Sequence, residues 1–197
     1  MRQAAKVDGR RKRSETSRNR IVDALMALVQ EGHAAPAAEQ VAERAGIGLR
    51  SVFRHFSDMD SLYAEICGRI AAGLEASARQ PFVAQDWRGQ LFEMIDRRAF
   101  VYEVIAPFQR AAEAHRHRSP ALRESHVRLV ATLRALLVGR LPLEVAAQAP
   151  LVEALDALLS FETWNRLREH QRLGVAEARG VLVHALCRLI ADAPGTT

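Results

Sequence analysis

The sequence predicts an all-α protein. Apolar residues recur at spacings of three and four along most of the 197 residues, which is the period of an amphipathic helix. Glycines and prolines divide these stretches, and no stretch alternates apolar and polar residues as a half-buried strand would. With 49% hydrophobic and 26% charged residues, the composition is that of a folded domain rather than a disordered chain.

The first expected helix runs from Ser17 to Glu31 and ends at Gly32. Its apolar stripe includes Ile21 and Leu25, so one face of this helix needs a partner to cover it. The segment that follows can supply that partner.

A glycine-marked turn joins two short helices in that segment. Residues 37–45 predict a helix ending at Gly46, where a left-handed C-terminal residue is favoured, and residues 48–56 predict a second helix. Such a pair forms a helix-turn-helix, whose second helix enters the major groove of DNA. Val52, Phe53 and Phe56 are expected to face inward. The side chains left for the groove are Leu49, Arg50, Ser51, Arg54 and His55. An ordinary helical hairpin is the alternative.

The remaining helices follow in order. Ser57 and Asp60 predict a variant capping box that begins a helix from Met59 to about Arg79. Prolines 81 and 107 are expected to end helices, and a proline at 120 suits the first turn of another. The other expected helices cover 87–104, 108–116, 120–139, 151–167 and the residues from 175 to about 190.

The N-terminal pattern resembles that of the TetR family of transcriptional regulators. The features that match are the first helix with Gly32, the run Val41-Ala42-Glu43-Arg44-Ala45-Gly46-Ile47, the pair Phe53 and Phe56, and Leu62. They cover the first third of the chain, from Ile21 to Leu62. The resemblance implies a helix-turn-helix DNA-binding domain over 16–58 and a helical effector-binding and dimerisation domain over 59–192, with a tail at 193–197. It also implies a homodimeric repressor that a small molecule releases from a palindromic operator.

The sequence departs from the family pattern at four positions. Ala37 stands where a hydroxyl residue is usual, Gly48 replaces a serine, Phe53 replaces a tyrosine, and Met59 replaces a lysine. These changes remove usual phosphate contacts. A helical small-molecule or protein-interaction module with a weakened DNA reader is therefore the alternative function.

Positive charge is concentrated at the N-terminus. Residues 1–20 hold eight Lys or Arg against two acids, a net +6, whereas the whole chain carries +5. Because non-specific DNA affinity comes almost entirely from phosphate attraction, we expect residues 1–15 to form a disordered basic arm along the DNA backbone or in a minor groove. A solvated leader without a role is the alternative. The predicted DNA-binding residues are Arg10, Arg11, Lys12, Arg13, Ala37, Gly48, Leu49, Arg50, Ser51, Phe53, Arg54 and His55.

Two further sets of residues follow from the resemblance. The middle helices should enclose an unknown small-molecule effector, and the candidates for lining that pocket are Trp87, Phe92, Met94, Phe100, Tyr102, Phe108, His115 and Trp164. The last two helices should pair with a second copy, and the candidates for that interface are Leu151, Leu155, Leu158, Trp164, Val181, Leu182, Ala185 and Leu189. Membership of the monomer's own core is the alternative for both sets.

Other functions find little support in the sequence. Glu113 and His117 have the i, i+4 spacing of metal ligands but resemble a solvated helix end, so no metal is expected. No catalytic motif and no cofactor motif occurs. An all-α enzyme that uses Glu113 and His117 is a third possible function, and no residue pattern requires it. No segment has the composition of a signal peptide or a membrane span, which predicts a cytoplasmic protein. Cys67 and Cys187 are expected to be buried thiols.

Overall fold

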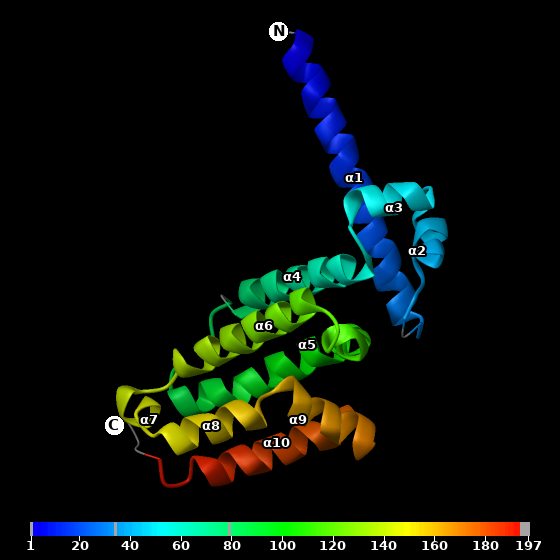
Figure 1. Ribbon diagram of the computed structural model, residues 1–197. Coiled ribbons are helices and arrows are strands. Elements are labelled where there is room, and N and C mark those ends of the chain that lie inside the picture. Colours follow the sequence, from blue (N-terminus) through cyan, green and yellow to red (C-terminus); the bar gives the residue numbers. More distant parts are fainter. Residues whose placement is uncertain (1, 34, 79, 194–197) are drawn as a thin grey trace. The chain divides into compact units, whose positions relative to one another are not determined.

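The computed structural model describes residues 2–33, 35–78 and 80–193, and those ranges contain helices and no strand (Figure 1). The all-α prediction is confirmed. The helices are α1 (Arg2–Gln30), α2 (Ala38–Ala45), α3 (Leu49–His55), α4 (Met59–Ala78), α5 (Trp87–Arg116), α6 (Pro120–Val138), α7 (Leu143–Ala146), α8 (Ala149–Leu158), α9 (Phe161–Asn165), the π-helical turn η1 (Arg166–His170) and α10 (Val175–Leu189).

The chain divides into two compact units. The first contains Met1–Ala71 with Pro107–His126, and the second contains Ala72–Ala106 with Val127–Thr197. The boundaries therefore fall inside α4, α5 and α6, and not at the expected junction after residue 58. Residues from α5 and α6 complete the core of the first unit, which sequence order alone could not indicate. Residues 194–197 of the expected tail lie outside the described residues.

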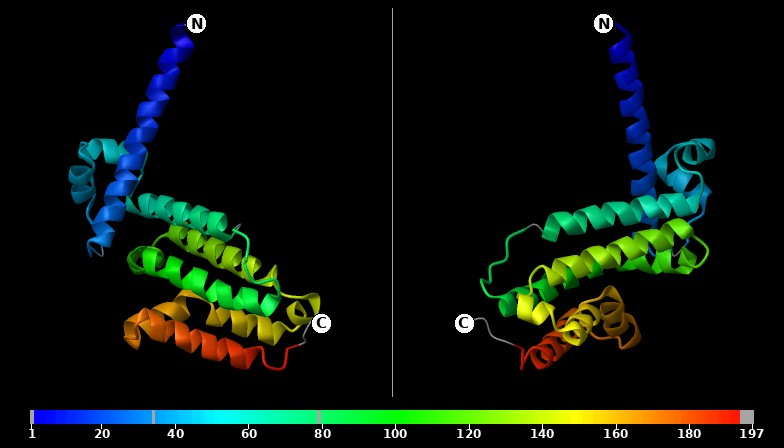
Figure 2. Two further views of the ribbon diagram at one scale, coloured as in Figure 1. Left: turned by 180° about the vertical axis from the view of Figure 1, so that it is seen from behind. Right: turned by 60° about the vertical axis from the view of Figure 1, so that its left-hand side comes forward.

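Helix α1 begins at Arg2, so the segment expected to be a disordered arm is helical. Residues 11–16 are exposed, whereas from Ile21 onward one face of α1 is buried in the core of the first unit. The apolar-stripe criterion detects only helices that bury one face, which is why it missed this extension. Residues 2–16 continue the helix beyond its packed part (Figures 1 and 2). At 1.5 Å per residue this extension is roughly 22 Å long.

Helix α4 begins at a cap, but the capping residue differs from the prediction. The carboxylate of Asp58 accepts a hydrogen bond from the backbone N–H of Ser61 at 2.7 Å, and the Ser61 hydroxyl accepts one from the Asp58 N–H at 3.3 Å. The reciprocal pair is therefore shifted by one residue from Ser57 and Asp60.

Helix α5 continues through Pro107, which was predicted to end it. The φ of a proline is compatible with a helix, but its missing N–H removes one backbone hydrogen bond. The helix can continue when burial of the residues on both sides offsets that loss. Ile105 and Phe108 provide that burial. The boundary between the two units nevertheless falls at Pro107.

The C-terminal stretch predicted as one helix over 151–167 is broken after Leu158. Ser160 caps the next helix by accepting a hydrogen bond from the Thr163 N–H at 3.1 Å. The carbonyl of Leu159, freed by the break, accepts hydrogen bonds from Arg98 and Tyr102, both at 2.8 Å. A buried arginine and tyrosine thus satisfy the carbonyl that the interruption exposes.

No described helix combines the length and the apolar character that crossing a membrane requires. Cys67 is half-buried, and burial raises the pKa of its thiol. Cys187 is exposed, contrary to the expectation of a buried thiol, because it lies on the outer face of α10.

Candidate functional site

The turn between α2 and α3 has the predicted geometry. Gly46 has φ +63°, the left-handed conformation, and its N–H donates to the Glu43 carbonyl at 3.0 Å. The N–H of Ile47 reaches the Ala42 carbonyl at 3.0 Å, so the end of α2 is closed by two backbone hydrogen bonds. Gly48 is the N-cap of α3 and provides no side-chain hydrogen bond.

The inner face of the helix-turn-helix packs on α1 and differs from the prediction at one position. Val52 and Phe56 are 1% and 3% exposed and belong to the core that also holds Ile21 and Val41. Phe53 is 48% exposed and was expected to face inward. Because α3 has seven residues, its buried stripe has room for Val52 and the following Phe56, and Phe53 lies outside it.

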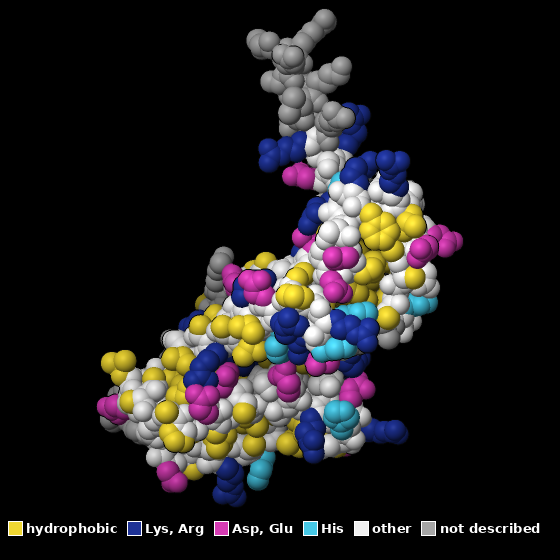
Figure 3. Space-filling view, in the orientation of Figure 1, with side chains coloured by type: hydrophobic (Ala, Val, Ile, Leu, Met, Phe, Trp, Pro, Cys, Tyr) yellow, Lys and Arg dark blue, Asp and Glu magenta, His cyan; other side chains and the backbone are white. Residues whose placement is uncertain are grey.

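The outer face of α3 presents the basic side chains that the sequence predicted. Arg50 and Arg54 are exposed and make no hydrogen bond or ion pair within the described part of the chain, and Ser51 is half-exposed. Leu49 is partly buried against the core. Lys and Arg side chains gather along α1 and around α3 on the face drawn in Figure 3. The exposed arginines can donate to DNA phosphates or base edges without first breaking an internal contact.

His55 is less available than its position on α3 suggests. Its Nε2 atom is enclosed and has no hydrogen-bond partner within the described residues. Burial lowers the pKa of His55 below its usual value, and the positive charges of Arg54 and Arg18 lower it further. The lowered pKa favours the neutral imidazole at neutral pH, so His55 adds little attraction for phosphate.

The start of α2 has the half of a capping box that Gln40 provides, and it lacks the half that an N-cap hydroxyl would provide. The Gln40 side-chain oxygen accepts a hydrogen bond from the backbone N–H of Ala37 at 2.8 Å. Ala37 itself is exposed and has no polar side-chain atom. The start of α2 therefore offers a phosphate its backbone N–H groups but no side-chain hydroxyl.

Arg18 belongs to the basic N-terminal segment, yet its side chain is engaged inside the first unit. Its guanidinium donates to the carbonyl of His55 at 2.9 Å and to the carboxylate of Glu65 at 2.8 Å. It also lies over the ring of Phe56, 4.3 Å from the centroid. Nothing in the sequence pattern separates this arginine from its basic neighbours, because its partners lie 37 and 47 residues away.

The rest of the basic segment is exposed where it is described. Arg11, Lys12, Arg13 and Arg20 lie on the surface of α1. The side chain of Arg10 falls outside the described residues. These cations belong to the same unit as Arg50, Arg54 and the rest of α3, which we call the reading helix.

The residues predicted for an effector pocket are distributed over both units. Phe108 and His115 belong to the first unit, and the other six belong to the second. Phe100 is 74% exposed, and His115 stacks on Tyr63 with ring centroids 5.5 Å apart. Helical spacing cannot distinguish an aromatic that fills the core from one that lines a cavity. The buried members are Trp87, Met94, Tyr102, Phe108 and Trp164, and Phe92 is half-buried.

A pocket of about 590 Å³ does exist within the second unit, beside the start of α5 and the turn after α6. Trp87 is the member of the predicted set that lines it. The Arg140 guanidinium lies over the ring of Phe82, 4.7 Å from the centroid. The lining residues are Gln85, Asp86, Trp87, Gln90, Gly139, Arg140, Leu141 and Pro142.

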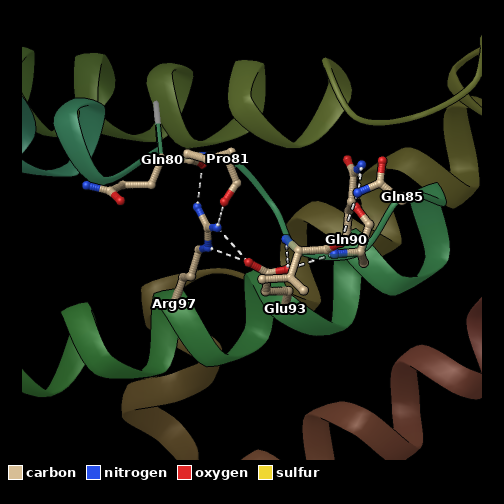
Figure 4. A network of polar contacts seen from close by, with 8 residues as sticks. Gln80, Pro81, Gln85, Gln90, Glu93 and Arg97 are labelled. Atoms are coloured by element: carbon tan, nitrogen blue, oxygen red, sulfur yellow. Dashed lines mark hydrogen bonds and ion pairs between the residues drawn. The ribbon is translucent and has the colours of Figure 1, made fainter.

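A polar network fixes the chain segment that leads into the pocket residues Gln85 and Asp86 (Figure 4). Arg97 donates to the carbonyls of Gln80 and Pro81 at 2.8 and 2.6 Å, and it pairs with Glu93. Glu93 in turn accepts a hydrogen bond from the Val83 N–H at 2.9 Å. The segment before α5 is thus tied to α5 by its own backbone groups.

The predicted dimer residues separate into an inner and an outer set. Leu155, Trp164 and Leu182 are buried in the second unit and are not on its surface. The indole N–H of Trp164 donates to Glu103 at 2.8 Å. The broad apolar faces of these helices therefore combine core with surface. The outer set consists of Leu151, Leu158, Val181, Ala185 and Leu189.

The two residues considered as metal ligands have arginine partners. Glu113 pairs with Arg116 at 2.5 Å, and the Nε2 atom of His117 accepts a hydrogen bond from Arg118 at 2.9 Å. Within the described residues, no three His, Cys, Asp or Glu side chains gather as a metal site would require.

Comparison with known proteins connects this geometry to a family. Residues 21–66 match the domain described as "Bacterial regulatory proteins, tetR family", a range that runs from the buried start of α1 into α4. A comparison with curated proteins found no match.

Solved structures share the fold along nearly the whole chain. A transcriptional regulator from Rhodococcus sp. Rha1 is 21% identical, with 91% of this chain and 99% of that chain covered and a TM-score of 0.67. A TetR transcriptional regulator from Rhodococcus sp. RHA1 is 14% identical, with 93% and 99% covered and a TM-score of 0.60. The multidrug binding protein EbrR, in complex with imidazole, is 23% identical, with 91% and 92% covered and a TM-score of 0.63. The matched domain and the shared fold thus support a DNA-binding transcriptional regulator of the TetR family.

Proposed function

We propose that this regulator is a homodimeric repressor that reads a palindromic operator with α3 and leaves it when a small molecule binds the second unit. The observation that carries the proposal is the outer face of α3. Arg50 and Arg54 are exposed there with no internal partner among the described residues, on a helix whose opposite face is buried. Such an arrangement leaves donors free for a DNA groove.

The roles of the reading residues follow from their exposure. Arg50 and Ser51 lie in the first turn of α3, the part of a recognition helix that meets base edges, so we assign them to base contacts. Phe53 and Arg54 are exposed further along and are assigned to the sugar-phosphate backbone. Ala37, Gly48 and Leu49 can contribute backbone or apolar contacts. His55 is the weakest member of the set because its ring is partly enclosed.

The basic part of α1 supplies the phosphate attraction that the rest of the chain lacks. Residues 1–20 carry the net positive charge, and Arg11, Lys12, Arg13 and Arg20 are exposed on a helix that extends past the reading head. Arg10 belongs to the same basic run. A helix carrying these charges can lie along the DNA backbone and neutralise successive phosphates.

A second copy would pack on the outer faces of α8 and α10. These helices contact each other, and their surface presents Leu151, Leu158, Val181 and Leu189. An apolar surface on two adjacent helices can pair with its own symmetry mate to form a four-helix interface. A twofold dimer presents two reading helices about 34 Å apart, one turn of B-DNA, which requires a palindromic site.

The small molecule would bind the pocket at the start of α5. A volume of about 590 Å³ lies within the range of ligand-binding cavities. The apolar surfaces of Trp87, Leu141 and Pro142 would hold a flat ring, and Arg140 would face a polar or acidic group of the ligand. The similarity to EbrR, described as a multidrug binding protein complexed with imidazole, supports a small molecule as the ligand.

The test is selection of DNA from a random pool by the purified protein, followed by salt titration on the enriched and on scrambled sequences. An enriched palindrome with half-sites about one helical turn apart would support a dimeric reader. Weak, steeply salt-dependent binding without sequence preference would overturn it. That outcome would favour an interaction module whose DNA-binding helices have Ala37 and Gly48 in place of the usual hydroxyl residues.

A further inference from the structure

Arg18 joins three elements of the first unit around the end of the reading helix. From α1, its guanidinium reaches the His55 carbonyl at the end of α3, the Phe56 ring that follows, and the Glu65 carboxylate on α4. The three contacts lie at 2.9, 4.3 and 2.8 Å. A planar guanidinium presents five donors in a fixed fork and a flat face to an aromatic ring, so it suits these different partners at one time.

Helix α3 has little else to fix its end. It is seven residues long, its N-cap Gly48 provides no side-chain hydrogen bond, and its last carbonyls lack partners within the helix. The Phe56 N–H donates to the Val52 carbonyl at 2.9 Å, and Arg18 takes the carbonyl of His55. Arg18 therefore holds the C-terminal end of α3, in addition to the packing of Leu49, Val52 and Phe56 on the core.

Glu65 is itself held in place by a second arginine. Arg69, one turn further along α4, donates to Glu65 at 3.3 Å and to the side chain of Asn19 at 2.7 Å. Asn19 follows Arg18 in α1, so these hydrogen bonds form a closed ring between α1 and α4. The hydrogen bond and positive charge of Arg18, together with Arg69, lower the pKa of Glu65, so this carboxylate is ionised at neutral pH.

We propose that Arg18 is a positioning residue that sets the angle of the reading helix against α4, and that it acts through Glu65 rather than by binding a phosphate. An arginine beside a basic DNA-binding segment would ordinarily be counted as a phosphate contact. Here its guanidinium is committed to a carboxylate, a carbonyl and an aromatic ring. The residue therefore governs sequence discrimination more than general DNA affinity.

Three variants of the full-length chain separate these roles. The contacts of Arg18 with His55, Phe56 and Glu65 form a clamp on the end of α3. Arg18→Gln removes this clamp and one positive charge. Arg11→Gln, further toward the N-terminus of the same helix, removes one positive charge from an exposed side chain and leaves the clamp intact. Glu65→Gln weakens the clamp while making the protein more positive. Each is titrated, at several salt concentrations, against the selected operator and against scrambled DNA.

We expect Arg18→Gln and Glu65→Gln to lower the ratio of operator to scrambled affinity by about tenfold, because each removes a charge-assisted hydrogen bond. Arg11→Gln should weaken both DNAs alike and preserve the ratio. The direction in which Glu65→Gln changes operator affinity decides between the two explanations. Simple charge attraction predicts tighter binding, whereas the clamp predicts weaker binding. Tighter operator binding by Glu65→Gln, or an unchanged ratio for Arg18→Gln, would overturn the proposal.

Hydrogen exchange gives a measurement independent of DNA. The amide of Phe56 should exchange faster in Arg18→Gln and Glu65→Gln than in the wild type, whereas amides of α10 in the second unit should be unchanged. Equal exchange of Phe56 in all variants would also contradict the clamp. If the wild type selects no operator, the proposed function fails, yet this exchange experiment still tests Arg18.

Discussion

The guanidinium Nη2 atom of Arg20 lies 2.9 Å from the position that a Cβ atom on Gly46 would occupy. The tight turn of the helix-turn-helix is therefore covered by a side chain from α1. Because Gly46 also has φ +63°, both its conformation and its surroundings favour glycine.

Replacing Gly46 should weaken the first unit. Gly46→Ala is expected to lower the free energy of unfolding by about 1–2 kcal/mol, because a Cβ strains the left-handed conformation and displaces the end of Arg20. Urea unfolding measures this change. Gly48→Ser is the control, since an added Cβ there meets no atom within 4 Å, and its hydroxyl should stabilise α3 by roughly a few tenths of a kcal/mol. Equal stability of the two variants would contradict the role of Gly46.

Substitutions in the reading helix and in the basic part of α1 should change DNA binding in different ways. Arg50→Ala should reduce discrimination at one base position of each half-site by about 1–3 kcal/mol, as removal of a direct base contact does. Joint replacement of Arg11, Lys12 and Arg13 by glutamine should weaken binding to all DNA and reduce the slope of log affinity against log salt by about 0.9 for each phosphate that is no longer neutralised. Binding measured on operator and scrambled DNA distinguishes them. An unchanged base preference in Arg50→Ala would remove Arg50 from the base-reading role.

The buried Arg98 should be more important to the second unit than Tyr102 beside it. Arg98 is 7% exposed and donates to the carbonyls of Leu133 and Leu159 at 2.7 and 2.8 Å. Arg98→Leu should lower the free energy of unfolding by about 2–4 kcal/mol, because two buried carbonyls lose a charged donor. Tyr102→Phe should cost about 1 kcal/mol, since Arg98 still satisfies Leu159. A smaller loss of stability in Arg98→Leu than in Tyr102→Phe would contradict this ranking.

Alkaline pH should destabilise the protein through Tyr102. Burial raises the pKa of its hydroxyl from 10.0 to about 12. The folded state therefore holds the proton more tightly than the unfolded state. The resulting stability is present below about pH 10 and is lost as pH rises through about 12, a change of about 3 kcal/mol. Urea midpoints over this range check it, and Tyr102→Phe should show a weaker pH dependence. An identical dependence would show that Tyr102 titrates normally.

The outer face of α10 should control oligomeric state. Val181 is 44% exposed, and Val181→Asp should convert a dimer to monomers, because a charge at the centre of an apolar interface loses its water without gaining a partner. Sedimentation or light scattering measures the mass. Val127→Asp is the matched control, since Val127 is also an exposed valine, 65% accessible, on α6. A mass that does not change in Val181→Asp would place any interface elsewhere.

The helix-turn-helix could be predicted from the sequence because its determinants are local. Gly46 needs a left-handed conformation, and Val41, Val52 and Phe56 recur at helical spacing, so the turn and the inner face follow from neighbouring residues. Phe53 was misplaced because the spacing marks an apolar side chain without saying whether the short helix can bury it.

The network around Arg18, the break at Leu159 and the pocket beside Trp87 depend on residues far apart in the chain. Arg18 reaches Glu65 across 47 residues, and Arg98 reaches Leu159 across 61. A sequence shows which residues are basic, aromatic or apolar, and local spacing determines which helices they form. Only tertiary packing decides whether a given arginine meets water, a carboxylate or a buried carbonyl, because that choice depends on which other elements come within hydrogen-bond reach.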